Sequence, residues 1–375
     1  MKKLLLILTL ALSLGLAGCL PNTDDPDPDE YTTAYTEEEL IELIESLIPE
    51  AQVDTTYDIA SFQEAIKNVI DEARGGVLGL QVSTALGTGT GSGVIYKHEG
   101  GYYYMVTNEH VVVDYLTVTV VYEKNGLLFE IGNSNVEVLG MDEVTDLAVL
   151  RFESDEDFNV ISFADSYDIY PGQFVFAIGN PLGFDYYGTV TMGVISGTAR
   201  YVQSGVFDAT LIQHDAAISP GNSGGALIDL NGELLGINNL KLVDQDVSNI
   251  GFAIPSNTVQ RIINDLEDDG EVTRPYLGIT TYSQINECGL DSGVCVYVQN
   301  GGAAQAAGLL DFDVIIGWKN ITVGMTEYLE IKNFNDLREA ILNSSVGDTI
   351  VLQYVRDGIE YESVETTLDV HPDDQ

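Results

Sequence analysis

The residues of this chain best suited to carry out a reaction are a histidine, an aspartate and a serine in three separate segments. Ser223 lies in the sequence PGNSGG at 220–225, where glycines allow a tight turn that exposes a hydroxyl and orients successive N–H groups. His110 follows a strand-like run, and Asp146 begins an apolar one. A serine hydroxyl becomes nucleophilic when an imidazole accepts its proton and a carboxylate fixes the imidazole tautomer. The order His, Asp, Ser along the chain therefore predicts nucleophilic acyl transfer.

The other three histidines fit this chemistry less well. His371 lies in the tail, and His98 lies beside a glutamate-glycine turn where solvent exposure is expected. His214 precedes the segment that leads to Ser223, and a structural role is favoured for it. Taken alone, the glycine-rich segment around Ser223 also fits a surface turn, and Asp146 also fits a capped strand end. It is the combination of the three residues that favours catalysis.

Five short segments resemble the HtrA family of trypsin-like serine proteases. They are TNEHVV at 107–112, DLAVL at 146–150, NPLG at 180–183, DAAI at 215–218 with GNSGG at 221–225, and NIGFAIP at 249–255. The similarity extends over roughly residues 77 to 370. It implies a mainly β protein, with a chymotrypsin-like double β-barrel protease domain followed by a small α+β PDZ domain. The active site would lie in the cleft between the barrels.

The resemblance also implies a role for each residue of the site. His110 is expected to be the general base, Asp146 to orient it, and Ser223 to be the nucleophile. The N–H groups of Gly221 and Ser223, helped by Asn222, are expected to stabilise the oxyanion that forms on the attacked carbonyl.

Residues near Ser223 bear on substrate choice. In basic-specific trypsin-like enzymes, an aspartate six positions before the serine lies at the floor of the substrate pocket, whereas this chain has Ala217 there. A cationic side chain would therefore have no partner in the pocket. We expect instead a shallow apolar wall that favours small aliphatic residues before the scissile bond. Its predicted residues are Ile218, Ile237, Asn238 and Leu240.

The pattern of the segments that contain these residues predicts an all-β domain at residues 73–272. From about residue 77, short runs rich in Val, Ile, Tyr and Thr alternate with Gly and Asn, which favours a barrel or sandwich. A helix is expected at 257–266, before a domain boundary near Thr273. The glycines at 87–93 fit no phosphate-binding loop, because they lead into a strand.

The chain from 273 to 370 predicts a small mixed domain, with a helix expected at 335–342. The sequence AAQAAGL at 303–309 resembles PDZ domains, whereas LDFD at 310–313 departs from their usual glycine-aspartate turn. A purely structural appendage is the alternative. The loop expected to bind the C-terminal carboxylate of a peptide through its N–H groups is Tyr276, Leu277, Gly278 and Ile279.

The N-terminus resembles an export and lipidation signal. Two lysines precede an apolar run at 4–17, as in secretory signal peptides. The run ends in LAGC, which resembles a bacterial lipobox and implies removal of residues 1–18 and lipidation of Cys19; an ordinary cleaved signal peptide is the alternative. Residues 19–35 are rich in proline and acid and predict an extended tether. Residues 36–72 carry two patterns of helical periodicity, around 40–48 and 61–70.

Charge and cysteine content restrict the partners. The formal net charge is -44, from 59 acidic and 15 basic residues, which disfavours binding to nucleic acid. The sequence suggests no chelating cluster, so neither a metal nor an organic cofactor is expected. Cys288 and Cys295 could close a disulfide loop outside the cytoplasm; free thiols are the alternative.

The family resemblance implies a serine endopeptidase that degrades unfolded or misfolded exported proteins in extracytoplasmic quality control. Expected partners are such polypeptides, C-terminal peptides and further copies of the chain, as a trimer or a multiple of it. Contact with the membrane is expected through the N-terminal lipid alone. The alternative is a PDZ scaffold or holding chaperone with a dormant protease domain. Activity is expected to rise as His110 loses its proton, because a protonated imidazole cannot accept the serine proton.

Overall fold

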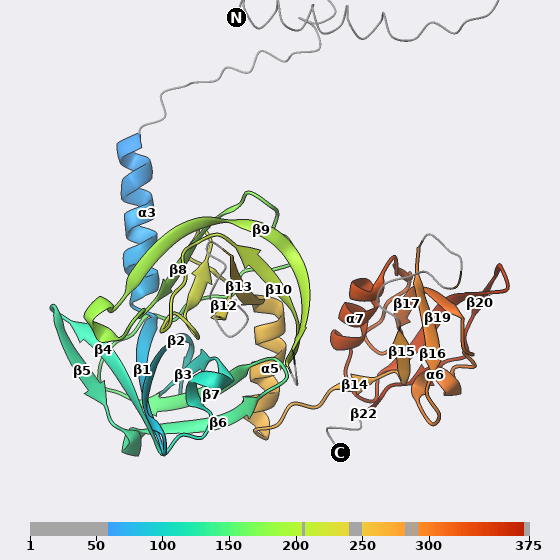
Figure 1. Cartoon of the computed structure of the whole chain (residues 1–375), viewed down its shortest axis with the longest axis horizontal. Coiled ribbons are helices and arrows are strands. Elements are labelled where there is room, and N and C mark those ends of the chain that lie inside the picture. The colour runs from blue at the N-terminus through green and yellow to red at the C-terminus, as the bar shows by residue number, and fades with distance from the viewer. Residues whose placement is uncertain (1–58, 205–206, 240–249, 282–287, 289–291, 371–375) are drawn as a thin grey trace, which may run out of the picture. The chain divides into compact units, whose positions relative to one another are not determined.

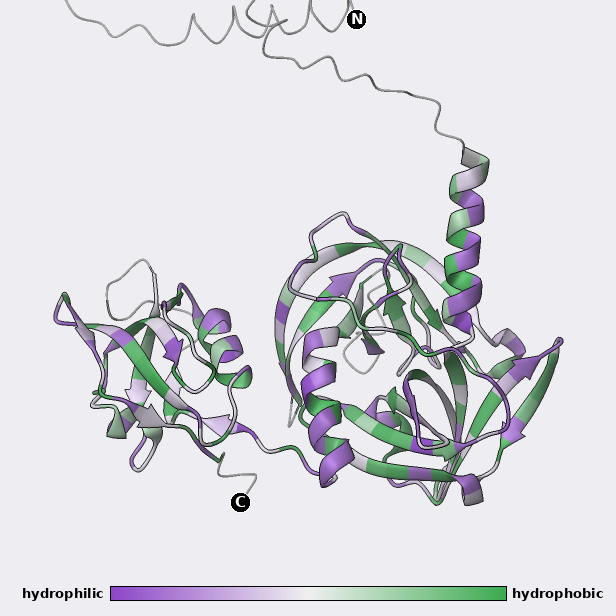
Figure 2. Ribbon diagram, turned by 180° about the vertical axis from the view of Figure 1, so that it is seen from behind, coloured by the Kyte–Doolittle hydropathy of each residue, from purple (hydrophilic) through white to green (hydrophobic). Residues whose placement is uncertain are grey.

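A computed structural model of the chain describes residues 59–204, 207–239, 250–281, 288 and 292–370 (Figure 1). Its first element is helix α3 (Ile59–Arg74), along which hydrophilic and hydrophobic residues alternate (Figure 2). Ile66, Val69 and Ile70 pack against the core of the domain that follows, as their spacing of three and four residues requires. The helical pattern expected at 61–70 is therefore confirmed.

The predicted signal peptide, the lipidation site Cys19, the tether and the first helical pattern at 40–48 lie outside the described residues. Within the described ranges, no helix combines the length and the apolar character needed to cross a membrane. Lipid anchoring stays a prediction.

Residues 77–153 form a seven-stranded antiparallel sheet of order β5-β4-β1-β2-β3-β7-β6, which wraps around its own core (Figure 1). Leu80, Met105 and Leu150 are fully buried in this core. Helix α4 (Glu109–Val112) follows the third strand, and the 3-10 turn η1 (Asn133–Asn135) precedes the sixth. The strands are β1 (Val77–Thr84), β2 (Gly87–Glu99), β3 (Tyr102–Thr107), β4 (Thr117–Lys124), β5 (Leu127–Ile131), β6 (Val136–Asp142) and β7 (Leu147–Glu153).

The next strands close into a barrel of order β10-β13-β12-β11-β8-β9. Its interior holds buried side chains that include Val175, Ile212 and Leu235. The 3-10 turn η2 (Phe184–Tyr186) lies between its first two strands. The strands are β8 (Phe174–Gly179), β9 (Thr189–Ser204), β10 (Phe207–His214), β11 (Ala226–Ile228), β12 (Leu234–Asn239) and β13 (Gly251–Pro255).

A further apolar core joins the first sheet to the barrel. Val106 and Val149 of the first sheet belong to the same buried cluster as Ile178 and Ile237 of the barrel. Helix α5 (Ser256–Asp268) adds buried residues to this cluster, which confirms the helix expected at 257–266. Burial of apolar surface at about 25 cal/mol per Å² stabilises this joint, so the chain segments at its rim are held at fixed positions.

Residues 275–370 build a smaller α+β domain with a separate core around Trp318. Its helices are α6 (Ala303–Ala306) and α7 (Phe334–Leu342). A capping box between Asn333 and Asp336 starts α7, and the helix expected at 335–342 is confirmed. The strands are β14 (Pro275–Tyr276), β15 (Ile279–Thr281), β16 (Val294–Val298), β17 (Val314–Asn320), β18 (Leu329–Glu330), β19 (Thr349–Arg356), β20 (Ile359–Glu362), β21 (Thr366–Thr367) and β22 (Asp369–Val370).

The unusual LDFD turn at 310–313 keeps a tight geometry without glycine. Phe312 adopts a left-handed conformation with φ of 71°, which costs a non-glycine residue about 1–2 kcal/mol. Its ring packs edge-on against Tyr297, with centroids 4.9 Å apart. Asp313 is fully buried and forms two hydrogen bonds with the guanidinium of Arg356, at 2.6 and 2.7 Å. These contacts stabilise the turn in place of the expected glycine.

Candidate active site

Strand pairing brings His110 and Asp146 together. In the antiparallel register of β3 and β7, Thr107 lies opposite Ala148, so the residues just beyond these strand ends are neighbours. The Nδ1 atom of His110 lies 2.7 Å from Oδ2 of Asp146, and the backbone N–H of His110 donates to Oδ1 at 2.9 Å. Asp146 is fully buried, and Asn108 donates to its carbonyl at 2.9 Å. Both oxygens of the carboxylate therefore bind His110, while Asn108 holds the backbone of Asp146.

This geometry selects one imidazole tautomer. When Nδ1–H donates to the carboxylate, Nε2 keeps its lone pair and is available as a base. A further donor reaches the same carboxylate, because Nδ2 of Asn239 lies 2.7 Å from Oδ2 of Asp146. Asn239 is not among the site residues predicted from the sequence, since it occurs in none of the family-like segments and only the barrel fold brings the end of β12 to Asp146.

The nucleophile turn lies against the strand that leads to His110. A Cβ atom on Gly224 would approach the hydroxyl oxygen of Thr107 to 2.2 Å and the carbonyl oxygen of Ser92 to 2.1 Å. Only glycine, here at φ of 80°, permits this approach. The carbonyl of Ser223 accepts a hydrogen bond from the N–H of Ser92 at 2.9 Å. The structure thus places Ser223 next to the end of β3. This strand ends at Thr107, three residues before His110.

The turn before the nucleophile carries the N–H group expected at the oxyanion site. The N–H of Asn222 donates to the carbonyl of Ser219 at 2.9 Å, and Gly221 has φ of 104°. Proline followed by glycine at the two central positions is the signature of a type II turn. The carbonyl of Pro220 accepts from the N–H of Leu182 at 2.6 Å. Because C=O and N–H of a trans peptide point in opposite directions, the N–H of Gly221 points away from Leu182.

Asn222 has a different role from the predicted one. Its N–H is used within the turn, and its side chain is buried with Oδ1 only 2.8 Å from where a Cβ of Gly179 would lie. Asn222 therefore stabilises the turn and does not present its N–H to an oxyanion.

The predicted substrate wall is only partly supported by the structure. Ile218 is half-buried, and its Cδ1 lies 2.6 Å from where a Cβ of Gly251 would be, so it sits on the start of β13. Ile237 and Asn238 are fully buried. Ile237 belongs to the apolar core that joins the first sheet to the barrel, and Nδ2 of Asn238 donates to the carbonyl of Ala226 at 2.8 Å. These two residues do not line an open pocket. Leu240 lies outside the described residues.

His98 and His214 lie in the environments that the sequence predicted, one exposed and one structural. His98 is exposed and stacks on Tyr103, with centroids 4.0 Å apart. His214 is fully buried, and burial lowers its pKa to about 4 although the nearby charge of Asp215 opposes this shift. His214 is thus neutral at physiological pH, in keeping with a structural role. His371 lies outside the described residues.

In the C-terminal domain, the predicted carboxylate-binding loop connects β14 to β15. Gly278 has φ of 77°, and a Cβ there would approach Cα of Gly302 to 2.6 Å. Leu277 is buried, and its carbonyl accepts from the N–H of Ala304 at 2.7 Å. Strand β15 lies at an edge of the described sheet, so its outer side is available for pairing. Cys288 and Cys295 form a disulfide, with their Cα atoms 5.9 Å apart.

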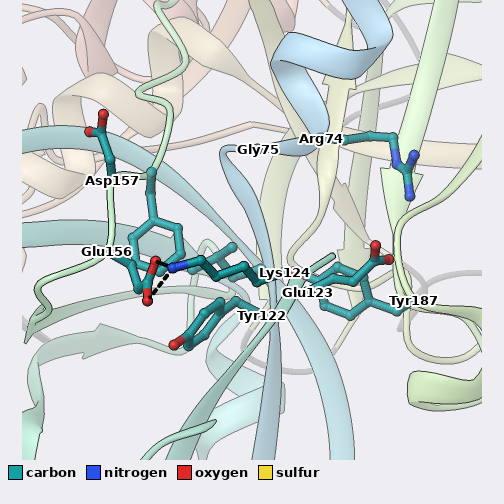
Figure 3. A pocket seen from close by; sticks show the side chains of 10 residues that line it. Arg74, Gly75, Tyr122, Glu123, Lys124, Glu156, Asp157 and Tyr187 are labelled. Atoms are coloured by element: carbon teal, nitrogen blue, oxygen red, sulfur yellow. Dashed lines mark hydrogen bonds and ion pairs between the residues drawn. The ribbon is translucent and has the colours of Figure 1, made fainter. Parts of the chain in front are cut away.

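A cavity of about 310 Å³ lies apart from the triad, near the end of α3 (Figure 3). The ion pair between Lys124 and Glu156, at 2.6 Å, lies in its lining with Tyr122, Arg74 and Tyr187. Burial raises the pKa of Tyr187. Among the described residues, no group of three or more His, Cys, Asp and Glu is placed to bind a metal ion. The cavity lining includes neither His110 nor Ser223, so the cavity adds no group to the candidate active site.

Comparison with known proteins agrees with this geometry. Residues 91–237 match the trypsin-like peptidase domain family. The chain is 38% identical over 292 residues to the serine protease Do-like HtrA of Bacillus subtilis, an alignment that covers 73% of this chain and 62% of that protein. It is 40% identical over 302 residues to the Do-like HtrA of Lactococcus lactis subsp. lactis, covering 75% of this chain and 69% of the relative. With the Do-like HtrB of Bacillus subtilis it shares 34% identity, over 92% of this chain and 77% of the relative.

Solved structures of serine proteases are also similar to this chain. The HtrA-type protease AlgW with a tripeptide has a TM-score of 0.63 at 30% identity, covering 82% of this chain and 97% of that one. A serine endoprotease from Yersinia pestis has a TM-score of 0.56 at 30% identity, covering 82% and 98%. With the positions of His110, Asp146 and Ser223 described above, these similarities identify the chain as a member of the HtrA family of trypsin-like serine proteases.

Proposed function

We propose that this chain is a serine endopeptidase that hydrolyses peptide bonds of unfolded or misfolded exported proteins outside the cytoplasm. The observation that carries this proposal is the buried carboxylate of Asp146, which binds both the ring and the backbone N–H of His110 beside the nucleophile turn. A carboxylate is costly to bury, and here it is stabilised by hydrogen bonds that also orient a base.

The reaction proceeds through an acyl-enzyme. Nε2 of His110 accepts the hydroxyl proton of Ser223 while Oγ attacks the substrate carbonyl. The N–H groups of Gly221 and Ser223 donate to the resulting oxyanion. The imidazolium then gives its proton to the leaving amine, and the C–N bond breaks. Water, deprotonated by the same Nε2, attacks the ester, and the imidazolium returns this proton to Oγ as the ester C–O bond breaks and Ser223 is released.

The type II turn at 219–222 supports a working enzyme over the alternative of a dormant scaffold, because it directs the N–H of Gly221 away from its anchoring segment. The test is digestion of an unfolded model protein by the wild-type chain and by Ser223→Ala, with cleavage sites mapped by mass spectrometry. We expect cleavage by the wild type alone. Binding of the unfolded protein without cleavage by either form would favour the scaffold.

The same cleavage map tests substrate preference. Ala217 provides no negative charge for a basic side chain, and the half-buried Ile218 against Gly251 offers a small apolar surface. We expect cuts mainly after small aliphatic residues. Cuts chiefly after Lys or Arg would contradict this part of the proposal.

We infer that the C-terminal domain at 273–370 is a PDZ domain that binds C-terminal peptides through Tyr276 to Ile279. The edge position of β15 and the close approach of Gly278 to Gly302 support a peptide that adds as a strand. Titration of the Ser223→Ala protein with a peptide bearing a free carboxylate, and with its amidated form, tests this. Equal affinities would refute carboxylate recognition.

The remaining elements of the proposal concern location and assembly. Removal of residues 1–18 and lipidation of Cys19 would attach the enzyme to a membrane by lipid alone, through the tether at 19–35. Family membership supports assembly as a trimer, or a multiple of it. Mass measurement of the N-terminal peptide and light scattering of the solubilised chain check the two claims. An unmodified thiol at Cys19, or a monomer at all concentrations, would contradict them.

A further inference from the structure

The hydroxyl of Ser92 lies where three separate segments meet behind the oxyanion turn. Ser92 belongs to β2 and is fully buried. Its Oγ donates to the carbonyl of Gly221 at 2.8 Å. The same Oγ accepts from the backbone N–H of Asn180 at 2.9 Å and from its Nδ2 at 3.0 Å. A hydroxyl has one donor and two acceptor sites, so these three bonds use its full capacity.

The backbone of Ser92 adds two more connections to the site. Its N–H donates to the carbonyl of Ser223 at 2.9 Å, and its carbonyl accepts from the hydroxyl of Thr107 at 2.6 Å. One residue of β2 therefore binds the carbonyl of Gly221 before the nucleophile and the carbonyl of the nucleophile itself. It also links them to the end of β3, which leads to His110.

Asn180 also supports the turn. It is fully buried, and its Oδ1 accepts from the N–H of Gly188 at 2.9 Å. Its carbonyl oxygen would lie 2.2 Å from a Cβ on Gly221, so the turn packs directly on it. The peptide before Gly221 is held by Leu182, and the peptide after it is held by Ser92. The orientation of Gly221 is thus determined at both of its peptide bonds.

We propose that Ser92 is a positioning residue for the oxyanion site, whose hydroxyl holds Gly221 so that its N–H is directed at the developing oxyanion. Donors fixed before the reaction stabilise the transition state because no reorganisation is needed when charge develops. Without the hydroxyl, the carbonyl of Gly221 and two donors of Asn180 lose a buried partner, and a rotated peptide becomes competitive. Ser92 touches neither substrate nor the reacting atoms in this account.

A purely structural role would have a different signature. A buried hydroxyl that only stabilises the fold lowers the unfolding temperature when it is removed, while the folded enzyme keeps its kcat. Loss of a directed oxyanion donor lowers kcat and weakens tetrahedral inhibitors, with little effect on KM. The proposal rests on the proposed hydrolase activity, so inactivity of the wild type would refute that activity and not this inference specifically.

The experiment compares Ser92→Ala with Ser256→Ala in the full chain. Ser256 is a matched control, because it is also fully buried and its hydroxyl donates to one carbonyl, that of Ala164, at 2.7 Å. The readouts are kcat and KM on a peptide substrate, the inhibition constant of a peptide boronic acid, and the unfolding temperature. The boronic acid forms a tetrahedral adduct with Ser223 that places an oxygen in the oxyanion site.

For Ser92→Ala we expect kcat to fall about 10- to 100-fold, somewhat less than the ~10²–10³ typical of deleting an oxyanion donor outright. The boronic acid should bind more weakly by a similar factor, with KM within about threefold of wild type. Ser256→Ala should keep wild-type kcat and inhibition. Equal kcat and inhibition in the two variants, or a raised KM with unchanged kcat in Ser92→Ala, would overturn the proposal.

A second variant covers the case in which Ser92→Ala does not fold. Ser92→Cys fills a similar space with a thiol that donates weakly, so it retains packing and loses most of the hydrogen bond. We expect it to fold and to lose at least about tenfold in kcat, by the same loss of a preorganised donor. Wild-type kcat and boronic acid affinity in Ser92→Cys would show that the hydroxyl does not position the turn.

Discussion

The buried imidazole of His214 is expected to make the protease domain acid-labile. Burial lowers the pKa of His214 to about 4, whereas a histidine in the unfolded chain titrates near its ordinary value of about 6.5. Below pH 6.5 the unfolded state binds a proton that the folded state does not. The stability provided by neutral His214 is therefore complete above this pH and is lost as pH falls toward 4.

The magnitude follows from the two pKa values. A difference of about 2.5 pKa units at about 1.36 kcal/mol per unit corresponds to about 3 kcal/mol when the loss is complete. At pH 5 the linkage relation gives about 2 kcal/mol of this loss. Such a value is a large fraction of the 5–15 kcal/mol that typically separates folded from unfolded domains.

The assay is urea unfolding at pH 7 and pH 5 of the wild type, His214→Gln and His98→Gln. The carboxylates titrate in all three proteins, so their contribution cancels in the comparison. We expect the pH-dependent loss of unfolding free energy to be about 2 kcal/mol smaller in His214→Gln than in the wild type. His98→Gln, at an exposed histidine, should behave as the wild type does. An equal loss of unfolding free energy in the wild type and in His214→Gln would show that His214 does not cause the acid lability.

Three further substitutions test other parts of the structure. Asn239→Ala removes a 2.7 Å hydrogen bond to the carboxylate of Asp146, and we expect kcat to fall about tenfold with KM unchanged, as steady-state kinetics would show; unchanged kcat would contradict it. Gly224→Ala puts a methyl group 2.1 Å from a backbone carbonyl at φ of 80°, so we expect loss of activity and a lower unfolding temperature by calorimetry. Arg356→Leu leaves the buried carboxylate of Asp313 without its cation, and we expect unfolding of the C-terminal domain to require about 3 kcal/mol less free energy in urea titration, whereas wild-type stability would be inconsistent with the ion pair.

The candidate triad could be proposed from the sequence because its chemistry requires particular residue types in particular surroundings. Ser223 is flanked by glycines, and His110 and Asp146 adjoin strand-like runs. The helices α5 and α7 could be predicted for a related reason, since apolar periodicity is a local property of the chain.

The residues that support the candidate site through hydrogen bonds could not be predicted from the sequence in this way. Ser92 and Asn239 act through hydrogen bonds to residues that are distant in sequence, and these contacts arise only from strand register and barrel closure. The substrate wall was overpredicted for a similar reason. A short apolar run such as the one around Ile237 fits a pocket wall and a core strand equally well, and only the packing of Ile237 against buried residues of the first sheet decides for the core.

Covalent labelling measures directly whether Asp146 and His110 make Ser223 nucleophilic. The chain is incubated with a fluorophosphonate at pH 8, and the rate and the site of labelling are determined by mass spectrometry for wild type, His110→Ala and Asp146→Asn. We expect a single adduct on Ser223, formed at least about 100-fold faster in the wild type than in either variant. Labelling of Ser223 at equal rates in all three proteins, or an adduct on another residue, would contradict this expectation.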